Sequence, residues 1–494
     1  MAYCMETKRL AKHSLIYSGT SILTQAVTLL LVPVFTKYMS QEEFGQYNLL
    51  ISVQSLLAIF ITMGIYSGMT RFINEFEDKN KTKNIVFTFS MAWGLLICLL
   101  SLSYGDLIYR MVFPFESGGG YYINFLVISS VLLCLISIYN SYFIMLFKPG
   151  LVSAINLVRA IFILLFSAYF IIIEKDGLYG ALEAQLYAYA VILAGLMLYD
   201  RNNIRIVFSW PEFKMMLNYS LGLIPGQASA WVYTLIDRYF INAMMGLQQV
   251  AIYSMGYKLG MMMEPILISP FKAVFTSFKY KVYKADDAPE KFREIYVYYN
   301  CIGWFCVLGF SVFAKPAIDL LSTSEYADSF MVVPLIVFSY FLYGLGEFYS
   351  LGIHIENKSL LDSLILGIGA GSNILMNIGL IPEFGIMGAA LATIMSYLIM
   401  NIIYYFVGKR YFDIGLRYLE PYKFGVVVLG LYGFYFSICS RINNLFLEMF
   451  FSSLICLLFI LISVVSGLIP RETAKIAFSQ LAKITGLAKS PGNI

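Results

Sequence analysis

The sequence predicts an all-α integral membrane protein with 14 transmembrane helices, arranged as two six-helix repeats plus two C-terminal helices. The first observation is composition: the 494 residues are 59% hydrophobic and only 13% charged, whereas soluble domains are roughly half apolar and a quarter charged. The second is a series of apolar runs, each near the ~20 residues that cross a bilayer core. The third is an internal repeat.

The repeat pairs two short motifs with later copies of themselves. Residues 39–47 (MSQEEFGQY) resemble residues 245–253 (MGLQQVAIY), and residues 177–182 (GLYGAL) resemble residues 385–390 (GIMGAA). Each copy lies at or beside a short link between two long apolar runs. Many secondary transporters are built from duplicated helix sets with a binding site between the halves. The repeat therefore indicates a carrier.

The apolar runs are expected to be helices, because a lipid-exposed backbone must satisfy its own hydrogen bonds. The period-two alternation of a membrane barrel is absent from the sequence. The expected spans are 14–36, 44–67, 85–108, 121–146, 153–174, 178–199, 215–238, 249–271, 294–314, 330–350, 359–381, 386–408, 422–440 and 445–469.

These spans divide the chain into five parts: a six-helix bundle (1–199), a connector (200–214), a second six-helix bundle (215–408), two additional helices (409–469) and a basic tail (470–494). In the tail, apolar residues recur at helical spacing beside lysines, which is typical of an amphipathic helix on an anionic leaflet. A frayed tail is the alternative.

The distribution of Lys and Arg predicts the orientation. With an even number of helices both termini share one side, and 25 basic residues fall on that side against 6 on the other. Because positive residues stay inside, both termini are expected in the cytoplasm. Two helix starts also carry capping signals: Ser40 with Glu43, and Ser209 with Glu212.

Two basic residues inside the spans are candidates for a substrate cavity, because a charge at the bilayer centre costs about 3 kcal/mol or more. Lys258 lies nine residues into its span, ~14 Å deep at 1.5 Å per residue. A structural ion pair, for instance with Glu264, is the alternative. Arg159 lies nearer the cytoplasmic end of its span, where it either faces the cavity or snorkels.

Two carboxylates within spans are candidates for coupling. Glu264 precedes Pro265, where a helix bend is expected. It either carries a coupling proton or pairs with Lys272 or a neighbouring helix. Glu347 has similar alternatives.

Arg71, Asp237 and Arg238 lie near the membrane faces at the ends of their spans. They are expected either to form gate ion pairs between the halves or to act as interfacial anchors. Gln25, Gln227 and Trp231, in the first helix of each repeat, offer amides and an aromatic face to a sugar. Equally, such groups join helices to one another.

No catalytic signature or metal-ligand cluster is evident in the sequence, which argues against an enzyme and against a bound cofactor or metal. A transporter without a nucleotide site needs another energy source, and a coupling H+ or Na+ is the candidate. The expected partner is the lipid bilayer, and no binding of nucleic acid is expected.

Several stretches of the sequence carry a resemblance to a known family: Leu221–Pro225, Asp237–Phe240, Gly246–Leu247, Val250–Ser254, Tyr257–Gly260, Asn377–Pro382, Phe384–Ile386 and Gly388–Ala390. With these stretches and the helix count, the chain resembles the polysaccharide-transporter branch of the multidrug/oligosaccharidyl-lipid/polysaccharide exporter superfamily, and most of all the O-antigen and capsule repeat-unit flippases of the Wzx type. Pro33 and the turn at 40–47 fit as well.

The resemblance implies translocation of an undecaprenyl-diphosphate-linked oligosaccharide across the bacterial cytoplasmic membrane by alternating access. It also implies a polysaccharide polymerase and a chain-length regulator as partners. The alternatives within the superfamily are a cation-coupled multidrug antiporter and a peptidoglycan lipid flippase. A polymerase or ligase is expected to have a larger outer loop than this chain offers.

Overall fold

The computed structural model describes residues 2–113, 118–416, 418–419, 421–439, 442 and 444–466, with the backbone alone for residues 2–18, 21 and 439. The predicted amphipathic tail lies outside the described residues. Every regular element within the described ranges is helical. Ten helices in those ranges are long and apolar enough to cross a membrane, with shorter apolar helices at Ile22–Tyr38 and Tyr422–Ile438. The all-α membrane class is thereby confirmed, and the number fourteen stays a prediction.

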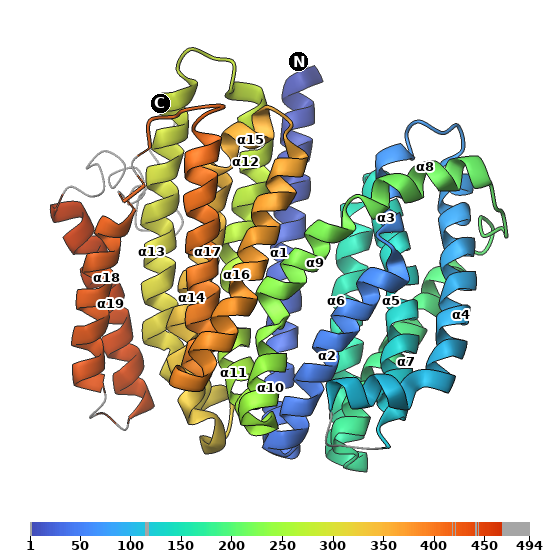
Figure 1. The fold of residues 1–494 in the computed structure, drawn as a ribbon, viewed down its shortest axis with the longest axis horizontal. Coiled ribbons are helices and arrows are strands. Elements are labelled where there is room, and N and C mark those ends of the chain that lie inside the picture. The colour runs from blue at the N-terminus through green and yellow to red at the C-terminus, as the bar shows by residue number, and fades with distance from the viewer. Residues whose placement is uncertain are drawn as a thin grey trace, which may run out of the picture.

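The first half of the chain forms the bundle on the right of Figure 1, with α1 in the middle of the molecule. Its elements are α1 (Ala2–Tyr38), α2 (Gln41–Thr62), α3 (Ile65–Phe72), α4 (Lys79–Val112), α5 (Gly120–Met145), α6 (Pro149–Ser167), η1 (Ala168–Glu174) and α7 (Gly177–Tyr199).

The second half forms the bundle on the left of Figure 1. It is preceded by α8 (Trp210–Leu221), which runs across the top of the first bundle. The elements of the second bundle are α9 (Ile224–Leu235), α10 (Asp237–Met245), α11 (Leu247–Gly260), η2 (Glu264–Ile268), α12 (Ser269–Val282), α13 (Ala288–Leu321), η3 (Ser324–Met331), α14 (Val332–Tyr349), α15 (Leu351–Ile355), α16 (Ser359–Phe384) and α17 (Ile386–Gly408).

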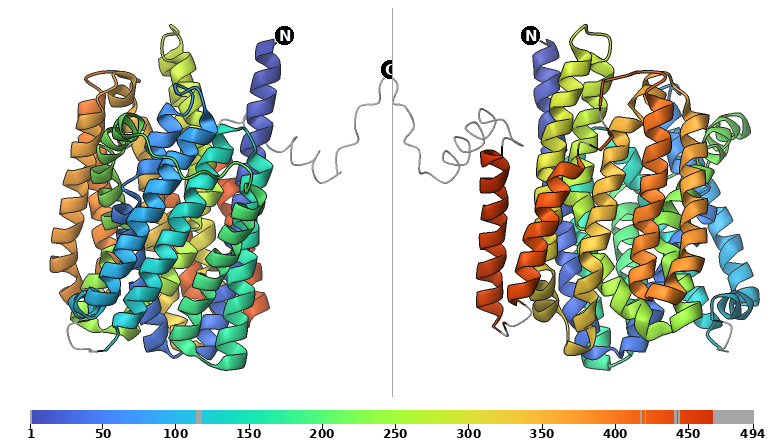
Figure 2. Two further views of the ribbon diagram at one scale, coloured as in Figure 1. Left: turned by 90° about the vertical axis from the view of Figure 1, so that its right-hand side faces the viewer. Right: turned by 60° about the vertical axis from the view of Figure 1, so that its left-hand side comes forward.

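The last two described helices, α18 (Tyr422–Cys439) and α19 (Leu445–Val465), stand as a pair beside α13 (Figure 2). Trp304 of α13 donates its indole N–H to the Pro421 carbonyl oxygen at 2.8 Å, and Ser452 of α19 donates to the Val312 carbonyl oxygen at 2.9 Å. Lys315 of α13 also pairs with Glu448 of α19. All three contacts attach this pair of helices to α13 of the second bundle.

Breaks in the helices account for most differences from the predicted spans. Met63 and Gly64 have φ of 46° and 63°, and their left-handed conformation separates α2 from α3. Pro225 and Pro265 lie in the first turns of α9 and η2, where a proline lacks the N–H needed to continue the preceding helix. The expected seventh span, 215–238, is therefore wrong in extent: α8 lies across one end, and α9 with α10 covers residues 224–245.

The two capping predictions have different outcomes. Ser40 and Glu43 form the expected capping box at the start of α2. Ser209 begins α8 without a side-chain capping bond, so the second capping box is wrong. Glu212 instead accepts an ion-pair hydrogen bond from Lys81 of α4 at 2.6 Å, which ties α8 to the first bundle.

The repeated motifs adopt repeated geometry. Gly177 opens α7 with φ of 49° and lies against the Glu43 side chain at the start of α2. Gly385 precedes α17 with φ of 59° and lies against Met245, directly before α11. Both positions require the left-handed region, which glycine enters without steric cost. Both bundles thus have a glycine with positive φ at the start of the helix that carries the second repeated motif.

Candidate functional site between the two bundles

Direct hydrogen bonds join the two bundles at the end of the molecule that holds the turn between α1 and α2. We call this the α1–α2 end, and the opposite end, at the top of Figure 1, the α8 end. The bonds run from Thr36 to the Leu321 carbonyl oxygen (3.3 Å), from Gln41 to the Glu325 carbonyl oxygen (3.0 Å) and from Gln248 to the Glu42 carboxylate (3.1 Å).

The same end is closed by tight packing of α2 against α11. A Cβ atom at Gly45 would overlap the Leu247 carbonyl oxygen, so only glycine permits this approach of the two backbones. Next to it, the rings of Phe44 and Tyr326 pack edge to face with centroids 5.7 Å apart. These residues belong to the repeated motifs 39–47 and 245–253 or contact them. The two copies of the repeat therefore meet each other across the interface.

Lys258 of α11 points into this interface. Its Nζ atom lies 4.5 Å from the ring centre of Phe44, 5.8 Å from that of Phe35 and 6.0 Å from that of Tyr47. No carboxylate in the described part of the chain lies within ion-pairing distance of it. The structural pair with Glu264 is thus not formed. A cation surrounded by aromatic faces is stabilised by ring quadrupoles while its charge stays available to an anion.

Arg159 of α6 also lacks a carboxylate partner among the described residues. Its guanidinium carbon lies 6.0 Å from the ring centre of Tyr189. The Tyr189 hydroxyl accepts a hydrogen bond from Gln185 at 3.0 Å, and Gln185 also donates to Gln54 of α2 at 2.7 Å. This chain of contacts leads from Arg159 to the wall of a cavity.

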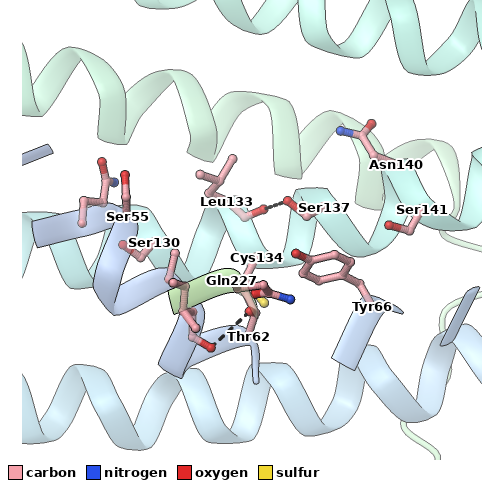
Figure 3. Close-up of a pocket in the computed structure, with 13 residues that line it drawn as sticks. Ser55, Thr62, Tyr66, Ser130, Leu133, Cys134, Ser137, Asn140, Ser141 and Gln227 are labelled. Atoms are coloured by element: carbon pink, nitrogen blue, oxygen red, sulfur yellow. Dashed lines mark hydrogen bonds between the residues drawn. The ribbon is translucent and has the colours of Figure 1, made fainter. Parts of the chain in front are cut away.

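The cavity has a volume of about 460 Å³, which is within the ~300–1,000 Å³ typical of small-molecule sites. The residues that line it are Gln54, Ser55, Ala58, Ile59 and Thr62 of α2, Tyr66 of α3, Ser130, Leu133, Cys134, Ser137, Asn140 and Ser141 of α5, and Gln227 of α9. Figure 3 shows the α5 residues along one helix with Thr62, Tyr66 and Gln227 close by. Most of the lining residues have polar side chains, apolar ones such as Ile59 and Leu133 lie between them, and none is charged.

The candidates from the first helix of each repeat have different environments. Gln227 lines the cavity, which is where a substrate-binding residue is expected. Trp231 donates its indole N–H to the Ser52 carbonyl oxygen at 3.0 Å and so joins α9 to α2 across the interface. Gln25, on α1, is partly exposed and is not among the cavity-lining residues.

Asp237 is fully buried inside the second bundle. Its carboxylate accepts hydrogen bonds from Tyr253 of α11 (2.5 Å), Asn377 of α16 (2.8 Å) and Thr393 of α17 (3.1 Å). Asn377 also donates to the side-chain oxygen of Asn373, and its own amide oxygen is buried without a described partner. The cluster thus gathers oxygen atoms from α10, α16 and α17.

Arg238 is also buried in the second bundle, where it donates to the Thr234 carbonyl oxygen at 2.8 Å and lies 4.7 Å from the Tyr257 ring centre. Arg71 pairs with Glu75, four residues along, and both side chains are about half exposed. None of these described contacts joins the bundles, so Arg71, Asp237 and Arg238 form no gate ion pair in this structure. The exposed pair of Arg71 with Glu75 is consistent with the alternative interpretation of Arg71 as an interfacial anchor.

Glu264 and Glu347 differ in their partners. Glu264 accepts a hydrogen bond from Ser269 at 2.9 Å and makes no pair with Lys272. Lys272 pairs instead with Glu347 at 2.8 Å, and Lys279 approaches the same carboxylate at 3.9 Å. Glu347 therefore joins α12 to α14, which favours its interpretation as a structural pair.

The sequence interpretation missed most of the cavity. On α5, the lining positions 130, 133, 134, 137, 140 and 141 form one helical face, and on α2 positions 54, 55, 58, 59 and 62 do so too. The sequence signal for this cavity was the recurrence of serine, asparagine and glutamine at this spacing within apolar runs. The five cysteines with described side chains, Cys98, Cys134, Cys301, Cys306 and Cys456, are free thiols.

Duplicated helical bundles with a site where they meet are a common architecture of membrane transporters, and here Gln227 of the second bundle completes a cavity of the first. The fold is similar to that of the lipid II flippase MurJ in an inward closed conformation, with a TM-score of 0.68, 14% identity, and coverage of 90% of this chain and 98% of that one. It is also similar to an inward-facing multidrug resistance MATE family transporter (TM-score 0.61, 15% identity, 78% and 94% covered). A MOP superfamily transporter from Pyrococcus furiosus gives 0.58 at 16% identity (83% and 97% covered).

Residues 10–277 match the family model described as polysaccharide biosynthesis protein, which is more than half of the chain. The chain belongs to this family. It is also 23% identical over 266 residues to an uncharacterized membrane protein of Methanocaldococcus jannaschii. That alignment covers 50% of this chain and about half (49%) of the relative.

Proposed function

We propose that the chain is a flippase that moves undecaprenyl-diphosphate-linked oligosaccharide repeat units, the precursors of O-antigen, capsule or exopolysaccharide, from the inner to the outer leaflet of the bacterial cytoplasmic membrane. The observation that carries the proposal is the polar, uncharged cavity lined by α2, α3 and α5 with Gln227 of the second bundle. Membership of a polysaccharide biosynthesis family and the fold shared with a lipid II flippase support it.

The proposed mechanism is alternating access. The distribution of basic residues in the sequence predicts that the α8 end faces the cytoplasm, which makes the hydrogen-bonded α1–α2 end the proposed outer side. In this state the cargo enters from the cytoplasm, and opening the α2–α11 contact releases it outside. Lys258 and Arg159, which lack carboxylate partners among the described residues, attract the diphosphate. Gln25, Gln227 and Trp231 are proposed as further binding residues, of which Gln227 lines the cavity in this structure. The polyprenyl tail stays in the bilayer.

The proposed coupling site is the Asp237 cluster. Carboxylate, amide and hydroxyl oxygens are the ligands that hard cations prefer, and Asp237, Asn373, Asn377 and Thr393 supply such oxygens in one buried place. The unpartnered amide oxygen of Asn377 fits this role. A Na+ bound there would neutralise the carboxylate and hold α10, α16 and α17 together; protonation of Asp237 is the H+-coupled alternative.

The experiment is deletion of the gene in its host and complementation with the wild-type chain. We expect the deletion strain to accumulate lipid-linked repeat units on the cytoplasmic leaflet and to lose surface polysaccharide, and the wild-type chain to restore both. Normal surface polysaccharide in the deletion strain, with changed sensitivity to cationic drugs, would refute the proposal and indicate an antiporter.

A peptidoglycan lipid flippase is the second candidate, because the fold is similar to that of MurJ over 90% of this chain. Both cargoes are polyprenyl diphosphates that carry sugars. The same strain separates the two candidates: accumulation of the peptidoglycan precursor, with cell lysis, would identify the second.

A further inference from the structure

We propose that the cavity between α2, α3 and α5 binds the sugar part of the cargo and selects for uncharged sugars. This inference rests on the proposed function and adds a substrate class to it. The cavity is lined by hydroxyls from Ser55, Thr62, Ser130, Ser137 and Ser141, by the amides of Gln54, Asn140 and Gln227, and by the phenol of Tyr66. These are the groups that hydrogen-bond to sugar hydroxyls.

Two of the amides have buried polar atoms without a partner in the described structure. Nε2 of Gln54 is a free donor, while its Oε1 accepts the bond from Gln185. Oδ1 of Asn140 is a free acceptor, while its Nδ2 donates to Asn156. The Gln54 side chain is only 5% exposed. A buried polar atom without a partner destabilises the protein, and a ligand that supplies both a donor and an acceptor removes this cost.

The network behind Gln54 fixes that side chain. Gln185 donates to both Gln54 and Tyr189, and Tyr189 lies beneath the Arg159 guanidinium. Arg159 therefore acts on the cavity only through two neutral side chains. It does not line the cavity, and neither does Lys258. The cationic residues and the sugar-binding wall are thus separate parts of the interface.

Shape and charge together define the ligand class. From Ser130 to Ser141 the lining follows α5 for about 17 Å at 1.5 Å per residue, long enough for an extended saccharide. A hexuronate or an aminosugar cation would enter without a counter-charge in the lining, and a buried charge without a partner is strongly disfavoured. Neutral hexoses and N-acetylhexosamines carry only hydroxyl and amide groups. The same argument excludes cationic drugs from this cavity.

Purified full-length protein in lipid nanodiscs provides the test. Four probes are compared by their dissociation constants: a polyprenyl diphosphate bearing a neutral N-acetylhexosamine disaccharide, the same lipid bearing a hexuronic acid disaccharide, the lipid without sugar, and the free neutral disaccharide. We expect the neutral glycolipid to bind about tenfold more tightly than the acidic one and than the bare lipid.

Asn140→Leu removes the free acceptor, and Asn124→Leu is the matched control on the same helix, because Asn124 does not line the cavity. We expect Asn140→Leu to weaken binding of the neutral glycolipid about tenfold and to leave the bare lipid unaffected, and Asn124→Leu to change neither. If Asn140→Leu does not fold, Asn140→Asp keeps the side-chain volume and should weaken binding of the acidic glycolipid most.

Equal affinities for the neutral and acidic glycolipids, or an unchanged affinity of the neutral glycolipid in the Asn140 variant, would overturn the inference. Failure of the proposed function gives a different result. In that case the free neutral disaccharide binds as tightly as the neutral glycolipid, and the bare lipid does not bind, which would leave a sugar site without a lipid-linked cargo.

Discussion

Lys258 illustrates how a single charge can be kept in the middle of a membrane protein. A carboxylate partner would neutralise it, but the structure surrounds it with Phe35, Phe44 and Tyr47 instead. Aromatic faces stabilise a desolvated cation by about 2 kcal/mol or more. Unlike an ion pair, they leave the positive charge uncompensated. The residue is therefore suited to a ligand that carries negative charge and leaves again.

The variant Lys258→Met tests this role. It removes the charge and keeps the length of the side chain, so we expect transport of lipid-linked oligosaccharide to fall about tenfold or more at equal expression, with Lys258→Arg retaining part of it. Because a buried charge is replaced by an apolar group, the melting temperature should not fall. Transport equal to wild type in Lys258→Met would show that Lys258 does not attract the cargo.

Asp237 leads to a prediction about ions. If the cluster binds Na+, the wild-type protein should be more stable to heat in sodium chloride than in choline chloride of the same ionic strength, by ~2.7 kcal/mol at a hundred times the dissociation constant. Asp237→Asn should abolish the difference, whereas Asp176→Asn, at an exposed position, should keep it. The same stability of the wild-type protein in both salts would contradict the Na+ site.

At the scale of elements, the contact between α2 and α11 is the feature that must open and close. Gly45 allows it, since any side chain there would overlap the Leu247 carbonyl oxygen. We expect Gly45→Val to separate the helices, lengthen the distance between spin labels at Lys37 and Met244, and lower transport about tenfold. Gly195 on α7 has open space around it, so Gly195→Val is the control. An unchanged spin-label distance in Gly45→Val would show that this contact does not close the α1–α2 end.

The first bundle is held at the α8 end by a buried ion pair between Lys83 of α4 and Asp200, which follows α7. Removing one partner of a buried pair leaves an uncompensated charge, so Lys83→Met should lower the free energy of unfolding by about 3–5 kcal/mol. The exposed pair of Lys291 and Asp287 provides the comparison: Lys291→Met should cost less than about 1 kcal/mol. Similar costs in the two variants, measured by denaturant unfolding, would be inconsistent with this account.

At the scale of the whole molecule, the all-α membrane class and the family could be predicted from the sequence. Bilayer thickness fixes the length of an apolar helix, and duplication leaves similar motifs at its links. The breaks at Gly64 and Pro225 were harder to place, because glycine and proline also occur within continuous membrane helices. The break at Pro225 changed the extent of the seventh predicted span, and the break at Gly64 divides the second one.

The site was less predictable than the fold. Gln227 was identified as a candidate and lines the cavity, but Asn140 and Gln54 were missed, because which face of α5 or α2 meets a cavity depends on packing of the other helices. The Asp237 cluster combines residues 140 and 156 positions apart along the chain. The periodicity within one helix does not indicate which residues of other helices will contact it.

Movement of a lipid-linked oligosaccharide between leaflets by this chain can be measured directly in reconstituted vesicles. Vesicles containing a polyprenyl-diphosphate disaccharide in both leaflets are treated with a membrane-impermeant glycosidase. We predict that, with the wild-type protein and an ion gradient, the inner-leaflet lipid also becomes cleavable, and that with Lys258→Met it is cleaved about tenfold more slowly or not at all. Protection of the inner-leaflet lipid in vesicles containing active, folded wild-type protein would contradict the account.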